Sequence, residues 1–190
     1  MKRVIEVIKN FFKVSFTKAK VLPLSLTAFL ILLDQIVKAV IVKIQPLHPA
    51  MISDVFKNDF LRILHVRNKA IAFSIGENFP EFIKPVLFIV VPVLVLLFLV
   101  WYFFKSDEFS AVQRWAAAGI IGGGLGNIID RIFRPDGVVD FISVKLYGFL
   151  GFDRWPTFNL ADSSVVVCCI LLLVTMFMPV KKTGKEPGNE

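Results

Sequence analysis

Two aspartates in the C-terminal half of the chain lie beside long apolar segments and could carry acid–base chemistry. Asp140 is embedded in the apolar run Val139–Ile142, and Asp162 lies three residues after Asn159. Two carboxylates that meet in a dry pocket cannot both ionise cheaply, so such a pair shares one proton and titrates as a unit. One carboxyl group can then activate water while the other protonates, which is the division of labour that amide hydrolysis requires.

The segment around Asp162 also has a structural interpretation. Asn159 precedes an apolar run and is a good helix N-cap, and Asp162 has the spacing of a capping-box partner at the end that the helix dipole favours for an acid. This interpretation explains Asn159 well and Asp162 in part. It leaves Asp140 unexplained.

Other polar residues lie within or beside the apolar segments, where a charge calls for a partner or a purpose. Asp34 and Lys38 have the i, i+4 spacing that lets a carboxylate and an ammonium group face each other on a helix. A neutralising pair is the preferred interpretation and direct catalysis the alternative. Asn68 offers a donor and an acceptor to a peptide backbone, and an ordinary turn residue is an equal alternative.

A further polar group follows the glycine-rich stretch 122–126. Glycines such as Gly126 let a second helix backbone approach closely within a bilayer. Asn127 and Arg131 are i, i+4 neighbours, and Asp130 directly precedes Arg131. A structural cap with an ion pair and a substrate-binding role are equal alternatives for these three residues.

The composition indicates that the bilayer is the solvent for most of the chain. Hydrophobic residues make up 56% and charged residues 19% of the 190 positions, and the apolar residues fall in long blocks. A spanning helix needs about 20 mostly apolar residues. Four blocks qualify, at about 22–42, 82–104, 111–129 and 163–180. We therefore predict a membrane α-helical fold, with four transmembrane helices in one domain over residues 1–190.

The distribution of Lys and Arg predicts the orientation of these spans. Eleven lie on the side of the two termini, and the two long connections carry fewer over a longer stretch: Lys57, Arg62, Arg67, Lys69, Arg131, Arg134, Lys145 and Arg154. The positive-inside rule then places both termini in the cytoplasm. The first apolar block is longer than the apolar part of a cleaved signal peptide and no small-residue cleavage site follows it, so we expect it to be retained.

The two long connections, at about 45–81 and 131–160, are expected to form a small extracytoplasmic β-sheet subdomain with a loop lid. Residues 60–67 alternate large apolar residues with polar ones, and residues 138–147 are rich in β-branched and aromatic side chains. Aromatic residues cluster there, as suits the interface between lipid and water. The polar tail 181–190 is expected to be disordered.

Several other function classes find little support in the sequence. His48 and His65 lack metal-site spacing, and no serine lies in a nucleophile elbow, so neither a metal nor another cofactor is expected. Cys168 and Cys169 are adjacent within an apolar block and have no partner pair. The net charge of +7 comes from residues near membrane boundaries, so no nucleic-acid partner is expected.

The motifs taken in series resemble bacterial lipoprotein signal peptidase, also called signal peptidase II. The resemblance spans residues 33–163 and rests on five motifs in order, each weak alone: Asp34-Gln-x-x-Lys38, Asn68 ahead of Ala72-Phe73-Ser74, Gly126-Asn127-x-x-Asp130-Arg131, Val139-Asp140-Phe141 and Asn159-x-Ala161-Asp162. It implies an aspartyl endopeptidase of the bacterial inner membrane, active at the outer face. It also implies that the enzyme cuts signal peptides from prolipoproteins, just before the cysteine that carries diacylglycerol.

The resemblance also implies roles for individual residues. Asp140 and Asp162 would be the catalytic pair. The substrate site, where the cyclic peptide inhibitor globomycin also binds in this family, would be lined by Asn68, Asn127, Arg131 and Asn159. The supporting residues would be Asp34, Lys38, Gly126, Asp130 and Ala161.

The chain departs from the family pattern at two places. Ala70 stands where a glycine is usual, which concerns the local turn and not the chemistry. The connection 143–156 is long and aromatic-rich, where a short link is usual. A small proton-coupled transporter is the alternative function, with Asp34, Lys38, Asp130 and Asp162 as a relay, but no inverted repeat is visible. A non-catalytic scaffold of the envelope is a third possibility.

Overall fold

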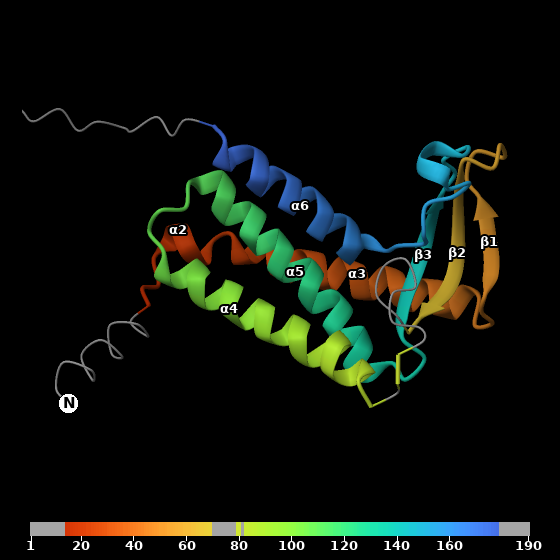
Figure 1. Cartoon of the computed structure of the whole chain (residues 1–190), viewed down its shortest axis with the longest axis horizontal. Coiled ribbons are helices and arrows are strands. Elements are labelled where there is room, and N and C mark those ends of the chain that lie inside the picture. The colour runs from red at the N-terminus through yellow and green to blue at the C-terminus, as the bar shows by residue number, and fades with distance from the viewer. Residues whose placement is uncertain (1–13, 70–78, 81, 179–190) are drawn as a thin grey trace, which may run out of the picture.

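The structure, a computed structural model, describes residues 14–69, 79–80 and 82–178. Helices form one end of the molecule, and a small sheet lies across the other end (Figure 1). The elements in chain order are α2 (Lys18–Val21), α3 (Leu24–Ile44), β1 (Ala50–Asp54), β2 (Leu61–Asn68), the π-helix η2 (Val86–Val90), α4 (Val91–Lys105), α5 (Ala111–Phe133), β3 (Val138–Val144), the 3₁₀-helix η3 (Phe149–Gly151) and α6 (Leu160–Met176).

Among the described residues, two helical stretches are long and apolar enough to cross a membrane. They are Lys18–Ile44, which joins α2 to α3, and Val86–Lys105, which joins η2 to α4. Helix α6 is also apolar but shorter, and α5 carries the polar residues of the site in its last turns. The predicted helical fold with a small sheet is therefore confirmed, and the count of four spans stays a prediction.

The ends of the last two helices differ from those that composition alone indicated. Helix α5 continues to Phe133, beyond the predicted end at residue 129, and α6 begins at Leu160, before the predicted start at residue 163. In both cases the backbone stays helical through polar residues that face the other helices. A hydropathy block therefore marks the apolar part of a helix, and the helix itself is longer.

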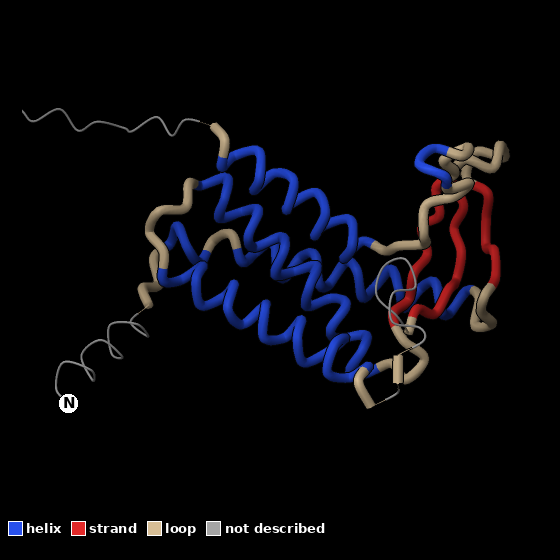
Figure 2. Tube along the Cα trace, in the orientation of Figure 1, coloured by secondary structure: helices blue, strands red, loops and turns tan. Residues whose placement is uncertain are grey.

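Helix α5 lies between the other long helices and approaches them closely (Figure 2). A Cβ atom added at Gly122 would lie 3.1 Å from the Cα atom of Thr27 in α3. One added at Gly126 would lie 2.9 Å from an Asp34 carboxylate oxygen and 3.2 Å from the Cβ atom of Ala161 in α6. The predicted close approach of helices at these glycines is confirmed, and it brings polar groups of three helices together.

The sheet is antiparallel, with strand order β1-β2-β3. Ile41 of α3 packs against Val139 and Phe141 of β3, and these three residues form a buried cluster. Because successive side chains along a strand point to opposite faces, Asp140, which lies between Val139 and Phe141, points to the other face of β3. The register pairs Asp140 with Val66 of β2. Packing of the sheet on the end of α3 thus fixes the position of one acid.

Some sequence predictions lie outside the described residues. They concern Ala70, the rest of the segment 70–78, and the tail 181–190. The long connection 143–156 is described. It continues β3 as a hairpin in which Lys145 bridges Arg154, and the backbone N–H of Leu146 donates to the carbonyl of Asp153 at 2.7 Å.

Candidate active site

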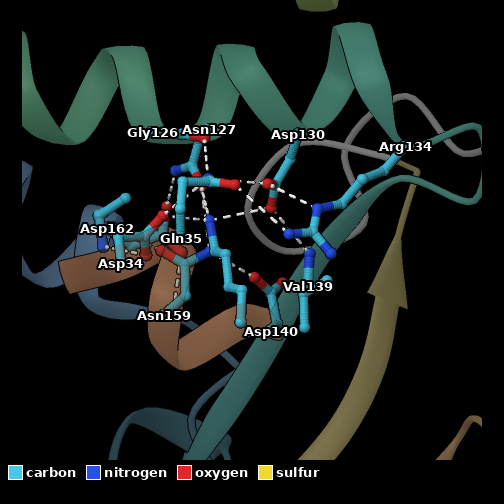
Figure 3. A network of polar contacts seen from close by, with 12 residues as sticks. Asp34, Gln35, Gly126, Asn127, Asp130, Arg134, Val139, Asp140, Asn159 and Asp162 are labelled. Carbon is cyan, nitrogen blue, oxygen red and sulfur yellow. Dashed lines mark hydrogen bonds and ion pairs between the residues drawn. The ribbon is translucent and has the colours of Figure 1, made fainter. Parts of the chain in front are cut away.

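The two aspartates meet around the side chain of Asn159, although they come from different elements (Figure 3). Asp140 belongs to β3, and Asp162 lies in the first turn of α6. Asn159 is fully buried, and its Nδ2 donates to Asp140 Oδ1 at 2.8 Å. Its Oδ1 accepts the backbone N–H of Asp162 at 2.9 Å. One buried amide therefore contacts both acidic residues.

The predicted capping box at the start of α6 is confirmed. The backbone N–H of Asn159 donates to Asp162 Oδ2 at 3.1 Å, which completes the reciprocal pair. Capping satisfies backbone donors that would otherwise lack partners at the helix start. It also fixes the rotamer of Asp162, so the structural and the chemical interpretations of this residue are compatible.

Two further asparagines complete the hydrogen bonds of the acids. Asn127 Nδ2 donates to Asp162 Oδ1 at 2.7 Å, and Asn68 Nδ2 donates to Asp140 Oδ2 at 2.9 Å. Asn159 Nδ2 also reaches Asn127 Oδ1, at 3.1 Å. Amide groups are uncharged, so they orient the carboxylates without neutralising them by an ion pair. All four carboxylate oxygens of the pair accept an N–H group.

The surroundings of Asp140 favour its protonated form. Burial raises the pKa of Asp140 to about 7, the hydrogen bond from Asn68 opposes this shift, and the nearby charge of Asp162 adds to it. Hydrogen bonds to a carboxylate favour its charged form, whereas desolvation and a second negative charge disfavour it. At neutral pH this carboxyl group can therefore hold or release a proton, as an acid–base group must.

A buried ion-pair cluster lies next to the aspartate pair. Lys38 is fully buried, and its Nζ lies 2.7 Å from Asp34 Oδ2 and 2.9 Å from Asp130 Oδ2. The same Nζ donates to Asn127 Oδ1 at 3.1 Å, which links the cluster to the site. Asp34 Oδ1 accepts the backbone N–H of Ala161 at 3.1 Å. The predicted pairing of Asp34 with Lys38 within α3 is confirmed, and the bond from Ala161 to Asp34 joins α3 to α6.

The ion pair that the sequence suggested for Asp130 has different partners. Asp130 pairs with Lys38 and, at 3.0 Å, with Arg134 Nε, one helical turn further on. Its adjacent residue Arg131 points elsewhere because neighbouring residues on a helix do not face the same side. Asp130 Oδ2 also accepts the backbone N–H of Val139 at 3.2 Å, which ties α5 to β3.

Two residues of the network were missed by the sequence analysis. Gln35 Nε2 donates to Asp130 Oδ1 at 3.0 Å and to the Gly126 carbonyl at 3.1 Å. Arg134 Nη2 donates to Gln35 Oε1 at 3.3 Å. The i, i+4 spacing of Asp130 and Arg134 was a signal for the second. The signal for Gln35 was its place in the motif Asp34-Gln-x-x-Lys38, whereas its bonds to Asp130 and Gly126 depend on the approach of another helix.

Arg131 is half-buried and lines a cavity beside the aspartate pair. The cavity has a volume of about 280 Å³, and Asn68, Lys84, Phe88 and Arg134 are also among its lining residues. Asn68 contacts Asp140 and faces this space as well. Neither aspartate is among the lining residues, so Asn68 is the residue that connects the cavity to Asp140.

Comparison with known proteins decides the family. The family model for signal peptidase (SPase) II matches residues 26–178. The chain belongs to the signal peptidase II family. It is 39% identical over 171 residues to the lipoprotein signal peptidase of Treponema pallidum (strain Nichols), covering 90% of this chain and 91% of that protein. It is 43% identical over 164 residues to that of Treponema denticola, covering 86% and 93%.

Solved structures agree with this family assignment. A bacterial membrane enzyme solved by the in meso method at 2.3 Å resolution has a TM-score of 0.69 and 26% sequence identity, covering 94% of this chain and 99% of that one. A second one, at 1.9 Å resolution, has a TM-score of 0.67 and 27% identity, covering 90% and 99%. Family membership makes the chain a membrane protease of lipoprotein processing, which favours the peptidase over the transporter interpretation.

Proposed function

We propose that the chain removes signal peptides from prolipoproteins that carry a diacylglyceryl-modified cysteine, by cutting the bond just before that cysteine, with Asp140 and Asp162 as an aspartyl dyad. One observation supports the dyad above all others. The two carboxyl groups come from separate elements, yet a single buried amide, that of Asn159, contacts both residues. The bridge between Ile142 and Phe158 and the helix cap at Asn159 hold both acidic residues beside this amide.

In the proposed reaction, one carboxylate takes a proton from water while the oxygen of that water adds to the scissile carbonyl carbon. The other carboxyl group donates its proton to the carbonyl oxygen. In the second step the first carboxyl group gives the proton that it took from water to the amide nitrogen as the carbon–nitrogen bond breaks. The second carboxylate takes back a hydroxyl proton of the tetrahedral intermediate, which restores the pair. The products are the carboxylate of the signal peptide and the free amine of the lipid-modified cysteine. The raised pKa of Asp140, about 7, supports this cycle, because this carboxyl group can hold a proton at neutral pH and release it.

The residues around the dyad divide into substrate contacts and supports. We propose that the substrate chain binds to Asn68, Asn127, Arg131 and Asn159, since amide and guanidinium groups can donate hydrogen bonds to peptide carbonyls. The same groups would bind the cyclic peptide globomycin. Asn68 and Arg131 line the cavity next to the pair. The supports are the ion-pair residues Asp34, Lys38 and Asp130, together with Gly126 and Ala161 at the contact of α3, α5 and α6.

We also propose the membrane arrangement. Helices α3, η2–α4, α5 and α6 would cross the inner membrane, with both termini in the cytoplasm and the sheet and the dyad at the outer face. The lipid-facing side chains support this arrangement: Leu94, Val95 and Phe98 of α4 are exposed by 58%, 59% and 62%. A substrate that is anchored by its own acyl chains would then reach the dyad at the membrane surface.

The proposed function is tested with purified protein in detergent, with EDTA present, on a diacylglyceryl prolipoprotein and its unlipidated twin. We expect cleavage of the lipidated form alone, and loss of cleavage in Asp140→Asn and in Asp162→Asn, because each change removes a proton-transfer group and nearly keeps its shape. Asp136→Asn is the matched control, since this exposed aspartate lies close to β3 in the chain. Cleavage by either dyad variant at the wild-type rate would refute the dyad, and cleavage of neither substrate by the folded protein would refute the function.

A further inference from the structure

The end of the sheet farthest from the dyad carries an unusual set of exposed rings. The turn between β1 and β2 and the hairpin after β3 meet there, because Leu61 pairs with Val144. Six aromatic side chains at this end are between 38% and 67% exposed, and we refer to them as the aromatic tip: Phe56, Phe60, Tyr147, Phe149, Phe152 and Trp155. A soluble surface seldom collects so many exposed rings, and such patches mark interaction sites.

The aromatic tip is held in place by ion pairs that meet at one residue, Asp59, and we refer to these ion pairs as the clamp. Its carboxylate accepts Lys145 Nζ at 2.8 Å and Arg154 Nη1 at 3.3 Å, and it also pairs with Arg62 Nε. The carbonyl of Asp59 accepts Arg154 Nη1 at 2.9 Å. Asp59 belongs to the β1–β2 turn, whereas Lys145 and Arg154 belong to the hairpin. The two halves of the tip are thus locked together, with the rings left outside.

The position of the tip indicates what covers it. In Figures 1 and 2 the hairpin with η3 projects from the top of β3 back towards the helical end of the molecule, to the side of α6. In this view no described helix covers η3 on the side that faces the helical end of the molecule. Helix α6 also carries exposed apolar side chains, among them Val166 at 57% and Val167 at 62%. The tip therefore lies on the α6 side of the sheet, next to a helix whose exposed side chains are apolar.

We infer that the aromatic tip is a lipid-binding surface that enters the interfacial region of the bilayer beside α6, with the phospholipid leaflet as its partner. Tyrosine and tryptophan rings are suited to this depth because they have an apolar body and a polar edge. Phe149 is the first residue of η3 and is 64% exposed, and Trp155 lies at the base of the hairpin, where its backbone N–H donates to the carbonyl of Val144. The clamp on Asp59 sets the depth by fixing the hairpin to the sheet. This surface is separate from the dyad and does not depend on the proposed reaction.

The experiment measures how deeply a fluorescent probe at the tip lies in a membrane. A bimane label is placed at Phe149→Cys in a Cys168→Ala, Cys169→Ala background, and the protein is reconstituted in phosphatidylcholine nanodiscs. Quenching is compared for lipids with a nitroxide near the glycerol backbone, lipids with a nitroxide near the acyl-chain end, and iodide in the water. Met51→Cys is the matched control, since Met51 is 58% exposed and its neighbour Ile52 packs towards the core, so Met51 faces away from the helices.

We expect the Phe149 probe to be quenched most by the nitroxide near the glycerol backbone and little by iodide, and the Met51 probe to show the reverse. In an Asp59→Asn variant the lipid quenching at Phe149 should fall, because the clamp loses its charge. Strong iodide quenching at Phe149 without lipid quenching would overturn the inference. So would protection from both quenchers that grows with protein concentration, since a second copy of the chain would then cover the tip. Cleavage activity of the labelled proteins serves as the check on folding.

Discussion

The hydrogen bond from Asn68 to Asp140 makes a quantitative prediction about the pH profile. Asn68 Nδ2 lies 2.9 Å from Asp140 Oδ2, and of the interactions that lower the pKa of this carboxyl group it is the largest. Replacement by alanine removes a donor that favours the charged form. The pKa of Asp140 must therefore rise further above its present value of about 7.

The size of the shift follows from the strength of the lost bond. A hydrogen bond to a charged group contributes about 1.5–3 kcal/mol, and one pKa unit corresponds to about 1.4 kcal/mol. The full range is therefore about one to two units. Asn68 is half-buried and lines the open cavity, so water replaces part of the lost interaction. We expect the shift in Asn68→Ala to be about one unit.

The assay is the pH dependence of kcat/KM for a lipidated substrate between about pH 5 and about pH 9, a range that covers both limbs of the profile. If the pair works with one shared proton, activity is lost on the alkaline side when Asp140 releases it, so this limb should move to higher pH in Asn68→Ala. Asn58→Ala is the matched control, because Asn58 is an exposed asparagine of the same subdomain that bonds only to the local turn. An alkaline limb that stays in place, or that moves to lower pH, would refute the reasoning.

Three other changes probe the supports of the site. Lys38→Met removes the cation that two buried carboxylates share and leaves Asp34 without a cationic partner, whereas Asp130 keeps Arg134. We expect it to lower the free energy of unfolding by about 3–5 kcal/mol, measured by denaturation in detergent. Gly126→Ala meets a carboxylate oxygen at 2.9 Å, so it should cost about 1–3 kcal/mol, whereas Gly124→Ala meets only a flexible leucine side chain and should cost less; equal melting temperatures would contradict this. Because the pKa of Asp140 is raised in the folded state, its protonated form contributes stability at low pH, and this contribution is lost as pH rises through about 7. The melting temperature of the wild type should therefore fall relative to that of Asp140→Asn between about pH 4 and about pH 8. A constant difference would show that Asp140 does not titrate there.

Local patterns along the chain predicted the parts of the site that are made within one element. The i, i+4 spacing predicted the pair of Asp34 and Lys38, and the N-cap pattern predicted the reciprocal bonds of Asn159 and Asp162. Both depend on helix geometry alone, which is the same in every protein. The glycine-rich stretch likewise predicted a close helix contact, although not which helices would approach.

Contacts between elements could not be predicted in this way. Gln35 gained its partners only because α3 and α5 approach at Gly126, and the link from Asp130 to the backbone of Val139 depends on how the sheet packs on the helices. The hairpin after β3 was expected as a lid, but its fixed shape depends on an ion pair with a distant turn. Such bonds follow from tertiary packing, and no spacing along the chain encodes them.

The packing of the sheet on the end of α3 has a mechanical consequence. One acid belongs to the sheet and the other to the first turn of α6. Ile41 and its apolar neighbours seat the sheet on α3, and Asp130 bonds the backbone of Val139. The carbonyl of Phe158, two residues before α6, accepts the backbone N–H groups of Phe141 and Ile142. A slide of the sheet across the helix ends would have to break these bonds, so the proposed pair stays aligned when lipid or a bound substrate pushes on the sheet.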